Sequence, residues 1–531
     1  MDTSAPKATS VLSRSFVGVK LLLLVVIGLG IFFRGANLDG KMFWGDETST
    51  LSRISGYYFS EIRDRFGNYS VPASELEQYQ QFAPNRGIPD VVDGLAVEEP
   101  QLPPAYFLSL RLWVKLFGKS VAAVRGFSAL SGILSIAAMF WLSQELLPMP
   151  LMAWAATALF AISPFQVLYA QEARPQSLWA LTLLLASAAL LRALRRNRTQ
   201  SWILYGLALT LSFYTYILSG VLAIAHGIYV LVQERFRPTP RLLAYMGTSI
   251  ISTLLFLPWL LRAFGSFAQL DSATAWTQQS VGLGVLLKTW ALNLSRGFGD
   301  LNYSFVQRDL LGYAGILAIA ALVAAALFLL VKTAEPKVWL FVLLLMGIIC
   351  LPLAGPDLLF GGRRSTVIRY FIPAFIGLDL MVAYSLIAQG FNSQKPVQQS
   401  FWRGVGAILL ATGILSCGIS AQADTWWNKY NGVDLPAVAD VVNAAADPVL
   451  ILDGQPPLEF SYLLAPTVVL QSVEASVPGD SAFVFSRNYS EDIRDSFLQQ
   501  HPEFRVAEEQ VWKQKVDPAY EYKLVLWTMA R

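Results

Sequence analysis

Long apolar runs recur along most of the chain and constrain its fold more than any other feature. They lie at about 17–34, 124–143, 150–168, 176–193, 200–217, 219–233, 242–261, 310–331, 338–355, 370–389 and 404–422. A helix needs roughly 18–20 apolar residues to cross a bilayer, and within lipid only helices and closed barrels satisfy every backbone polar group. The pattern therefore predicts a polytopic α-helical membrane protein with about eleven spans.

The composition supports this class, with 54% hydrophobic and 15% charged residues. The net charge of +3 is small, and the basic residues gather between apolar runs, which reports topology rather than nucleic-acid binding. We therefore expect no nucleic-acid partner. The run from Val17 to Phe33 lacks a small-residue cleavage site, so we interpret it as a retained first helix rather than a signal peptide.

The segment 103–118 decides the predicted topology. It is apolar but short, and it carries Arg111 and Lys115, which favours an amphipathic helix lying at the membrane interface. With this helix on the surface and the N-terminus inside, the basic clusters at 192–198, 235–241, 332–337 and 395–403 all fall on the cytoplasmic side. A spanning helix at 103–118 would reverse all of them.

This topology predicts three outer regions, at 35–123, 262–309 and 423–531. The first two are rich in aromatic residues and are expected to form a roof of interfacial segments over the spans. The third alternates β-prone runs, at 448–452, 467–470, 482–485 and 522–527, with helical stretches. We therefore expect a membrane domain at 1–422 and a small extracytoplasmic α/β domain at 423–531, which shows no catalytic constellation of its own.

Carboxylates gather on the predicted outer face. Asp46 and Glu47 follow the first span, Glu172 follows the third in the loop 169–175, and Glu98 and Glu99 precede the interfacial helix. Ionisable groups near a membrane persist mainly where they bind or react, so these are candidate catalytic or binding residues. A solvated turn at 46–47 and an ion pair between Glu172 and Arg174 are the structural alternatives.

Three arginines violate the charge rule, because the topology puts Arg363, Arg364 and Arg369 outside. Guanidinium groups bind phosphate in bidentate fashion, and Gly361 and Gly362 would let the backbone approach a headgroup. A lipid phosphate or pyrophosphate fits, and Arg369 at the mouth of a span is the sharpest candidate. The alternative is nonspecific contact with anionic membrane lipids.

The order of these motifs resembles the polyprenyl-phosphate-sugar-dependent glycosyltransferases of the GT-C class, over about residues 17–390. The resemblance rests on the acidic pair after the first helix, Pro103-Pro104, the loop Gln171-Glu172-Ala173-Arg174, and Arg369-Tyr370 before Pro373. It is nearest to the bacterial branch related to protein O-mannosyltransferases and to the transferase that adds aminoarabinose to lipid A.

The resemblance implies a GT-C fold, a sugar donor linked through phosphate to a polyprenol, an acceptor hydroxyl on the outer side, and inversion at the anomeric carbon. Asp46 matches the family's general base, and Glu47 or Glu172 would assist it, position substrate or hold a divalent cation. The remaining site residues are expected to bind the donor phosphate (Arg369, Arg363, Arg364, Arg174) or the substrates (Tyr169, Gln171, Tyr370, Glu98, Glu99).

Several matters stay open from the sequence. Residues Gln101-Leu102 and Ala105 flank the Pro-Pro element where many relatives carry a histidine or an aromatic residue, so the acceptor could be a lipid, a glycan or a protein. Only His226 and His501 are present, so no histidine-rich metal site is predicted. We expect His226 to pack within a span and His501 to be exposed.

Other function classes fit parts of the pattern. A transporter or flippase would place charges deep within spans, whereas the carboxylates here gather on one face. A lipid-phosphate hydrolase would use the same residues with water as the acceptor, and a scaffold would only display the C-terminal domain. The motif set favours a multi-pass protein of a bacterial plasma membrane with its active site outside.

Overall fold

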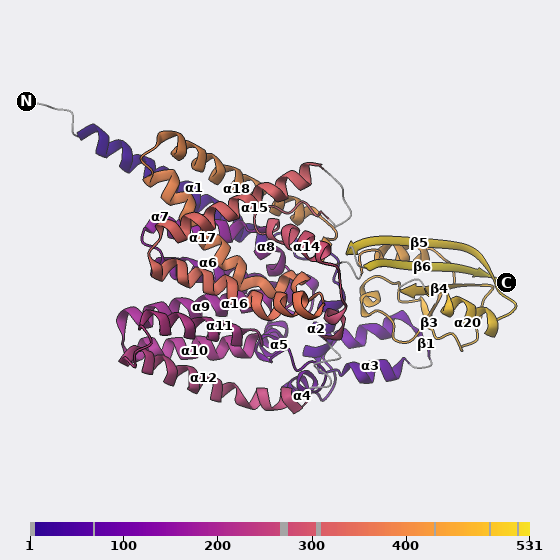
Figure 1. The fold of residues 1–531 in the computed structure, drawn as a ribbon. Helices are drawn as coiled ribbons and strands as arrows, with labels where there is room; N and C mark the ends of the chain where they lie inside the picture. The colour runs from indigo at the N-terminus through magenta and orange to yellow at the C-terminus, as the bar shows by residue number, and fades with distance from the viewer. Residues whose placement is uncertain are drawn as a thin grey trace, which may run out of the picture.

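The computed structural model describes residues 6–66, 69–265, 274–303, 310–429, 432–487, 490–517 and 520–531. A bundle of long helices forms most of the molecule, and a twisted sheet packs at one end of it (Figure 1). The short helices of the first outer region lie around the end of the bundle that faces the sheet (Figure 1).

Eight helices in the described ranges are long and apolar enough to cross a membrane. They are α1 (Pro6–Gly35), α6 (Val121–Leu146), α9 (Gln176–Arg196), α12 (Pro240–Gly265), α15 (Leu310–Thr333), α16 (Pro336–Phe360), α17 (Ile372–Asn392) and α18 (Pro396–Gln422). A bent pair, α7 (Pro150–Ile162) and α8 (Pro164–Ala170), makes a ninth candidate, and α10 (Thr199–Thr215) and α11 (Ser219–Gln233) are shorter. Each predicted apolar run is therefore helical, and the chain is a multi-pass membrane protein.

The bend between α7 and α8 has a local cause. Ser163 precedes Pro164 and takes ψ 117°, because a residue before proline is disfavoured in the helical region. Pro164 then starts a new helix whose direction differs by 56°. The loop after α8 is thereby carried toward the end of the bundle where the sheet lies.

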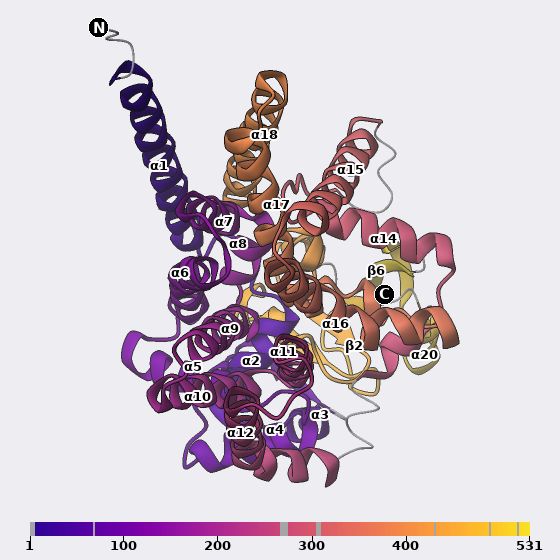
Figure 2. The ribbon, with the colours of Figure 1, turned by 60° about the vertical axis from the view of Figure 1, so that its left-hand side comes forward.

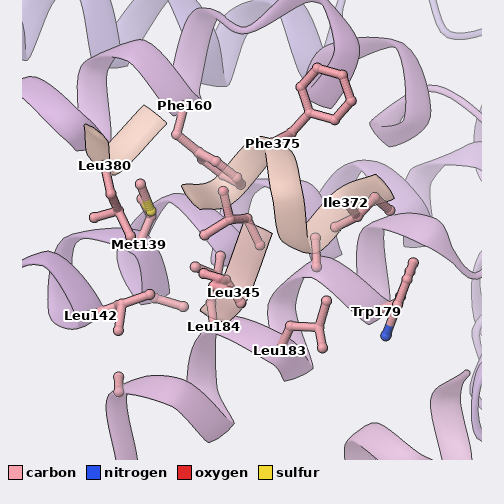
Figure 3. Packing of buried hydrophobic residues seen from close by; sticks show 14 of the residues in the cluster. Met139, Leu142, Phe160, Trp179, Leu183, Leu184, Leu345, Ile372, Phe375 and Leu380 are labelled. Carbon is pink, nitrogen blue, oxygen red and sulfur yellow. The ribbon is translucent and has the colours of Figure 1, made fainter. Parts of the chain in front are cut away.

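The core of the bundle surrounds α17. In the most apolar stretch of α17, 89% of the residues are buried. The corresponding value for α15, which lies at the periphery, is 11% (Figure 2). Side chains from four other helices, including Met139, Phe160, Trp179 and Leu345, meet those of α17 such as Phe375 (Figure 3). These contacts fix the spans whose ends carry the polar loops.

Short elements cap this end of the bundle. The first outer region contributes α2 (Gly45–Ser55), α3 (Phe59–Arg65), η1 (Ala73–Gln80), α4 (Ile88–Glu98) and α5 (Ala105–Phe117), and later segments add η2 (Ala275–Gln278), α14 (Leu283–Ser295), η3 (Arg364–Thr366) and η4 (Ile368–Phe371). At 13 residues α5 is too short to span, as expected. Its Arg111 is buried and donates to the backbone oxygens of Ile54 and Arg86, so it braces α2 rather than reaching solvent.

The C-terminal region folds around one sheet in the order β1-β3-β2-β4-β6-β5. Its strands are β2 (Val449–Leu452), β3 (Val469–Gln471), β4 (Ser481–Arg487), β5 (Arg505–Asp517) and β6 (Tyr520–Ala530), and its helical elements are η5 (Trp427–Lys429), α19 (Leu435–Asn443), η6 (Leu458–Tyr462) and α20 (Asp492–Gln500). β2 runs parallel to β3 and β4, and the other pairs are antiparallel. The small α/β domain expected from the sequence is present.

One edge strand of this sheet comes from far away in the sequence. β1 (Ser70–Pro72) lies in the first outer region and pairs with β3, with Val71 opposite Leu470. Phe66 and Tyr69 beside it pack into the same core as Leu435 and Leu470. The domain boundary at 422/423 stays a prediction. The first outer region contributes one strand and several core side chains to the C-terminal domain.

The expectation that His501 is exposed is wrong. Its ring packs on Phe497 at 4.7 Å between centroids, and its Nε2 lies 3.3 Å from the Val473 carbonyl oxygen. An imidazole can bury its ring when one nitrogen has a hydrogen-bond partner. His226 is buried among α9, α10 and α11, with its Nε2 3.1 Å from the Ser187 hydroxyl, in agreement with a packing role.

Candidate active site

The acidic pair lies in the first turn of α2. Carboxylates are favoured there because the first N–H groups of a helix are unpaired and carry partial positive charge. The helix ends at Gly56, whose φ of 97° suits glycine and whose N–H bonds the Arg53 carbonyl at 3.0 Å. Glu47 is fully buried and the Asp46 side chain is 28% exposed, so the pair does not form a solvated turn.

Asp46 faces two arginines from other parts of the chain. Nη1 of Arg369 lies 2.7 Å from Asp46 Oδ2, and Nε of Arg174 lies 3.6 Å from the same oxygen. Burial opposes ionisation of Asp46, but the charges of Arg174 and Arg369 outweigh it and lower the carboxyl pKa. Asp46 is thus an ionised, partly exposed carboxylate held by two guanidinium groups.

Glu47 points in the other direction, into the protein. It receives two bonds from Arg125, at 2.7 and 2.6 Å, one from Lys429 at 3.0 Å and one from the Ala173 N–H at 2.9 Å. Burial raises the pKa of Glu47, yet the charges of Arg125 and Lys429 outweigh it, so the pKa falls to about 2. Glu47 therefore binds the first outer region to α6 and to the loop after α8.

Glu172 lies near both members of the pair. Its carboxylate accepts a hydrogen bond from the Asn428 amide and lies 3.5 Å from Lys429 Nζ. Burial raises the pKa of Glu172; Lys429 opposes the shift, and Glu47 adds to it. Neighbouring carboxylates in one site therefore have pKa values displaced in opposite directions, as active sites often show.

The rest of the loop after α8 mainly braces the site. Arg174 Nη1 donates to the Asp46 carbonyl at 3.2 Å and to Thr50 Oγ1 at 3.1 Å, so it holds α2 as well as facing its carboxylate. Gln171 accepts from Lys41 at 3.0 Å and donates to backbone oxygens at the end of α1. Tyr169 is buried against Phe165.

The three outer arginines separate in the structure. Arg369 reaches Asp46 and lies 5.9 Å from the ring centroid of Tyr370. Arg364 instead pairs at 3.1 Å with Asp357, a buried carboxylate at the end of α16. Arg363 lies over the Trp276 ring at 5.9 Å. A phosphate-binding role for all three stays a prediction, and the geometry brings Arg369 to the acidic pair.

Glu98 and Glu99 share a partner. Arg53 contacts Glu98 at 2.6 Å and Glu99 at 3.3 Å. Glu98 also accepts from the N–H groups of Phe59 and Ser60, at 2.8 and 2.9 Å, and so caps α3. Glu99 has a raised pKa because of its burial, which the charge of Arg53 opposes, and it lies in the field of Asp46 and Arg174.

Divalent-cation binding remains open. Among the residues that the structure describes, no group of three or more His, Cys, Asp or Glu side chains is suited to hold a metal ion. The carboxylates of the site lie beside cationic side chains.

Comparisons with known proteins found one matching family model and several similar structures. Residues 101–261 match the family model described as dolichyl-phosphate-mannose-protein mannosyltransferase. The structure is similar to ArnT from Cupriavidus metallidurans bound to undecaprenyl phosphate, with a TM-score of 0.51 and 13% identity, over 97% of this chain and 98% of that chain. The apo structure of the same protein gives a TM-score of 0.50 at 13% identity, with 97% and 98% covered.

The chain has the GT-C glycosyltransferase fold. The resemblance inferred from the order of the motifs is confirmed. The oligosaccharyltransferase of Archaeoglobus fulgidus is also similar, with a TM-score of 0.48 and 12% identity over 84% of this chain and 64% of that chain. No curated protein matched the sequence.

Several polar residues of the candidate site were not predicted from the sequence. Arg125, Lys41, Asn428 and Lys429 all reach the acidic loops. Lys429 and Lys41 follow spans on the predicted outer side, so each is an exception to the charge rule of the kind that singled out Arg369. Arg125 was hidden because it lies in the second turn of a long apolar helix.

Proposed function

We propose that the chain is an integral membrane glycosyltransferase that moves a sugar from a polyprenyl-phosphate donor to the hydroxyl of a lipid, glycan or protein. The observation that carries this proposal is the contact of 2.7 Å between Asp46 and Arg369, residues 323 positions apart. It puts a carboxylate able to accept a proton beside a guanidinium able to bind phosphate. ArnT, which has the same fold, binds undecaprenyl phosphate.

The reaction follows from these two groups. The acceptor oxygen attacks the anomeric carbon while the bond from that carbon to the phosphate oxygen breaks, which inverts the anomeric centre. Asp46 takes the proton of the hydroxyl, and the polyprenyl phosphate leaves with the bonding electrons. Arg369 stabilises the negative charge that grows on the departing phosphate.

The ion pair also implies an order of events. While Arg369 holds Asp46, its charge keeps the carboxyl pKa low and makes Asp46 a weak base. A phosphate near Arg369 competes with Asp46 for the guanidinium. Binding of the donor would therefore release Asp46 toward the acceptor, so that the base becomes stronger when the donor is present.

The proposed setting is a bacterial plasma membrane with the site on the extracytoplasmic face. A lipid-linked donor suits that side, because nucleotide sugars are confined to the cytoplasm. The basic clusters between the spans support this orientation through the charge rule.

The decisive experiment compares wild type with Asp46→Asn in nanodiscs, given radiolabelled polyprenyl-phosphate sugars and a membrane extract as the acceptor source. We expect transfer by wild type and a loss of about 10²–10⁴-fold in the variant, with an unchanged melting temperature. Asp480→Asn, at a carboxylate that is 92% exposed, is the matched control. Near-normal transfer by Asp46→Asn would contradict the assignment of Asp46 as the general base. Release of sugar only to water would favour a hydrolase.

A further inference from the structure

The segment that joins α18 to the C-terminal domain passes through the candidate active site. The indole N–H groups of Trp426 and Trp427 both donate to Asp300 Oδ2, at 2.8 and 2.6 Å. The guanidinium of Arg296 stacks on the Trp427 ring at 3.5 Å from its centroid. The segment is therefore fixed to the second outer region directly before it reaches the carboxylates.

The next two residues of this segment contact both inner carboxylates. Lys429 is fully buried, and its Nζ lies 3.0 Å from Glu47 and 3.5 Å from Glu172. Asn428 is 5% exposed and donates to Glu172. A buried ammonium group is costly unless carboxylates compensate it, so Lys429 and the two glutamates depend on one another.

The two glutamates depend on Lys429 to different degrees. Glu47 also receives two hydrogen bonds from Arg125, which would hold it if Lys429 were replaced. Glu172 is 1% exposed and relies on the linking segment for its contacts with Lys429 and Asn428. The linking segment is therefore more important for Glu172 than for Glu47.

The C-terminal domain also packs on the segment before Asp46. The Met42 N–H donates to the Asp424 carbonyl at 2.9 Å, and the rings of Phe43 and Tyr462 lie 5.1 Å apart. Gly45 faces Glu459 so closely that a Cβ there would lie 3.0 Å from the carboxylate. The domain thus touches the chain on both sides of the acidic cluster.

We propose that Asn428 and Lys429 are positioning residues of the active site, which hold Glu172 in a fixed position beside Asp46 and so make the entry to the C-terminal domain part of the catalytic unit. This inference rests on the proposed glycosyl transfer. Neither residue needs to touch the substrate. Their effect reaches the reaction through Glu172 and through the charge balance around the acidic pair.

The charged groups around Glu172 determine how replacement of Lys429 would change the pKa of Glu172 and therefore the pH profile of transfer. The groups that face it are cationic (Lys429, Arg369, Arg125, Lys41), carboxylate (Glu47, Asp46) and phenolic (Tyr169, Tyr106). Removal of the nearest cation raises the pKa of Glu172, because burial and two carboxylates already favour its protonated form. The acid limb of the pH profile should then move to higher pH.

The experiment measures donor-dependent transfer against pH for wild type, Lys429→Met and Lys429→Arg in nanodiscs. We expect Lys429→Met to lose about 10²-fold in kcat at pH 7. Its acid limb should rise by about 1–3 pH units, while the KM for donor changes little. Lys429→Arg should restore most of both. Lys337→Met, at a lysine that is 56% exposed, is the matched control and should match wild type.

Two further variants separate positioning from general damage. In Glu172→Gln the titrating group is gone, so adding Lys429→Met should move the acid limb no further. If Lys429→Met does not fold, Asn428→Ala tests whether the linking segment positions Glu172, because this variant leaves the ion pairs of Lys429 in place. It should shift the acid limb of the pH profile in the same direction by a smaller amount. If Lys429→Met folds and has the wild-type pH profile of transfer, the inference is overturned. If Lys429→Met does not fold, a wild-type pH profile of Asn428→Ala overturns it. Absence of transfer by wild type overturns the proposed function instead.

Discussion

In the proposed reaction, Arg369 contacts Asp46 before the donor binds and the donor phosphate afterwards. We expect Arg369→Gln to raise the KM for donor about 10–100-fold, because a hydrogen bond to a charged group contributes about 1.5–3 kcal/mol. The acid limb of the pH profile should also rise, since Asp46 loses a cation that lowers its pKa. Initial rates over a range of donor concentrations and pH values measure both effects.

Arg364→Gln provides the comparison for this prediction. Its guanidinium pairs with Asp357 and lies on the same loop as Arg369. We expect it to lower the melting temperature while leaving the KM for donor within about twofold. Equal effects of the two variants on KM would contradict a specific role of Arg369 in phosphate binding.

Glu47 makes a prediction about stability. Its pKa in the folded protein is about 2, against an ordinary value of 4.5, so its ion pairs stabilise the fold above pH 4.5 and this stabilisation is lost as the pH falls toward 2. We expect Glu47→Gln to cost about 3–5 kcal/mol at pH 7, because Arg125 stays buried without its carboxylate and Lys429 keeps only Glu172.

Melting curves from pH 7 to pH 3 test this expectation. The difference between wild type and Glu47→Gln should shrink as the pH falls through the window. Glu61→Gln, which breaks a pair at a carboxylate that is 46% exposed, should cost at most about 1 kcal/mol. A constant difference at all pH values would contradict the ion-pair origin of the stabilisation.

At this scale the sequence predicted the residues that topology brings together. Asp46, Glu172 and Arg369 lie in loops that charge patterning put on one side of the membrane, and they meet in the structure. Lys429 was not predicted as a site residue, because a single cation after the last span resembles an ordinary surface lysine. The pairing of Arg364 with Asp357 was not predicted, because Asp357 comes two residues after the apolar run 338–355 and was not considered as a partner.

At the scale of elements, the close approach of α6 and α8 positions the loop that carries Glu172. A Cβ at Gly132 would lie 2.7 Å from Cβ of Ala170, two residues before Glu172. Small residues let helices approach in a membrane, so we expect Gly132→Val to force α6 and α8 apart at a cost of about 1–3 kcal/mol. Transfer should fall by more than the loss of folded protein, because Glu172 moves.

Gly18→Val is the control for this prediction. A Cβ at Gly18 in α1 would meet nothing within 4 Å, so the same substitution should be tolerated there. Melting temperature and specific activity of the two variants are the measurements. Wild-type activity in folded Gly132→Val would show that this approach does not position the loop.

The elements themselves were predicted to different degrees. The apolar runs identified the spans, because hydropathy acts over a whole helix and tolerates single polar residues. β5 was missed since its sequence, Arg505 to Asp517, is rich in charge and is held in the sheet by pairing with β6. Strand formation there follows from tertiary contacts rather than from propensity.

At the scale of the whole molecule, the pairing of β1 with β3 joins the first outer region to the C-terminal domain. Val71 and Leu470 are opposite each other across this pair, and such residues have Cα atoms about 4.5–5.5 Å apart, which a disulfide can bridge. We expect Val71→Cys with Leu470→Cys to crosslink on oxidation when Cys350 and Cys417 have been replaced. Proteolysis between the two sites followed by non-reducing electrophoresis detects the bond.

Val71→Cys with Leu450→Cys is the control pair. Leu450 lies at the same level of the sheet but one strand further away, because it pairs with Leu470. Two strand spacings amount to about 9–10 Å, beyond the reach of a disulfide. Crosslinking of the control pair and not of the test pair would contradict the strand order. No local pattern in the sequence could have shown the pairing of β1 with β3, because the two strands lie far apart in the chain. Tyr69 and Ser472, which are hydrogen-bonded beside this pair, are 403 positions apart.

That pairing has a consequence for how the protein is made. During synthesis, the first outer region leaves the ribosome long before its sheet partner does. The edge strand and the apolar side chains beside it must wait, uncovered, until almost all later spans have been inserted. Lys429 arrives at the same late stage, so the acidic loops acquire their last counterion only when synthesis is nearly complete.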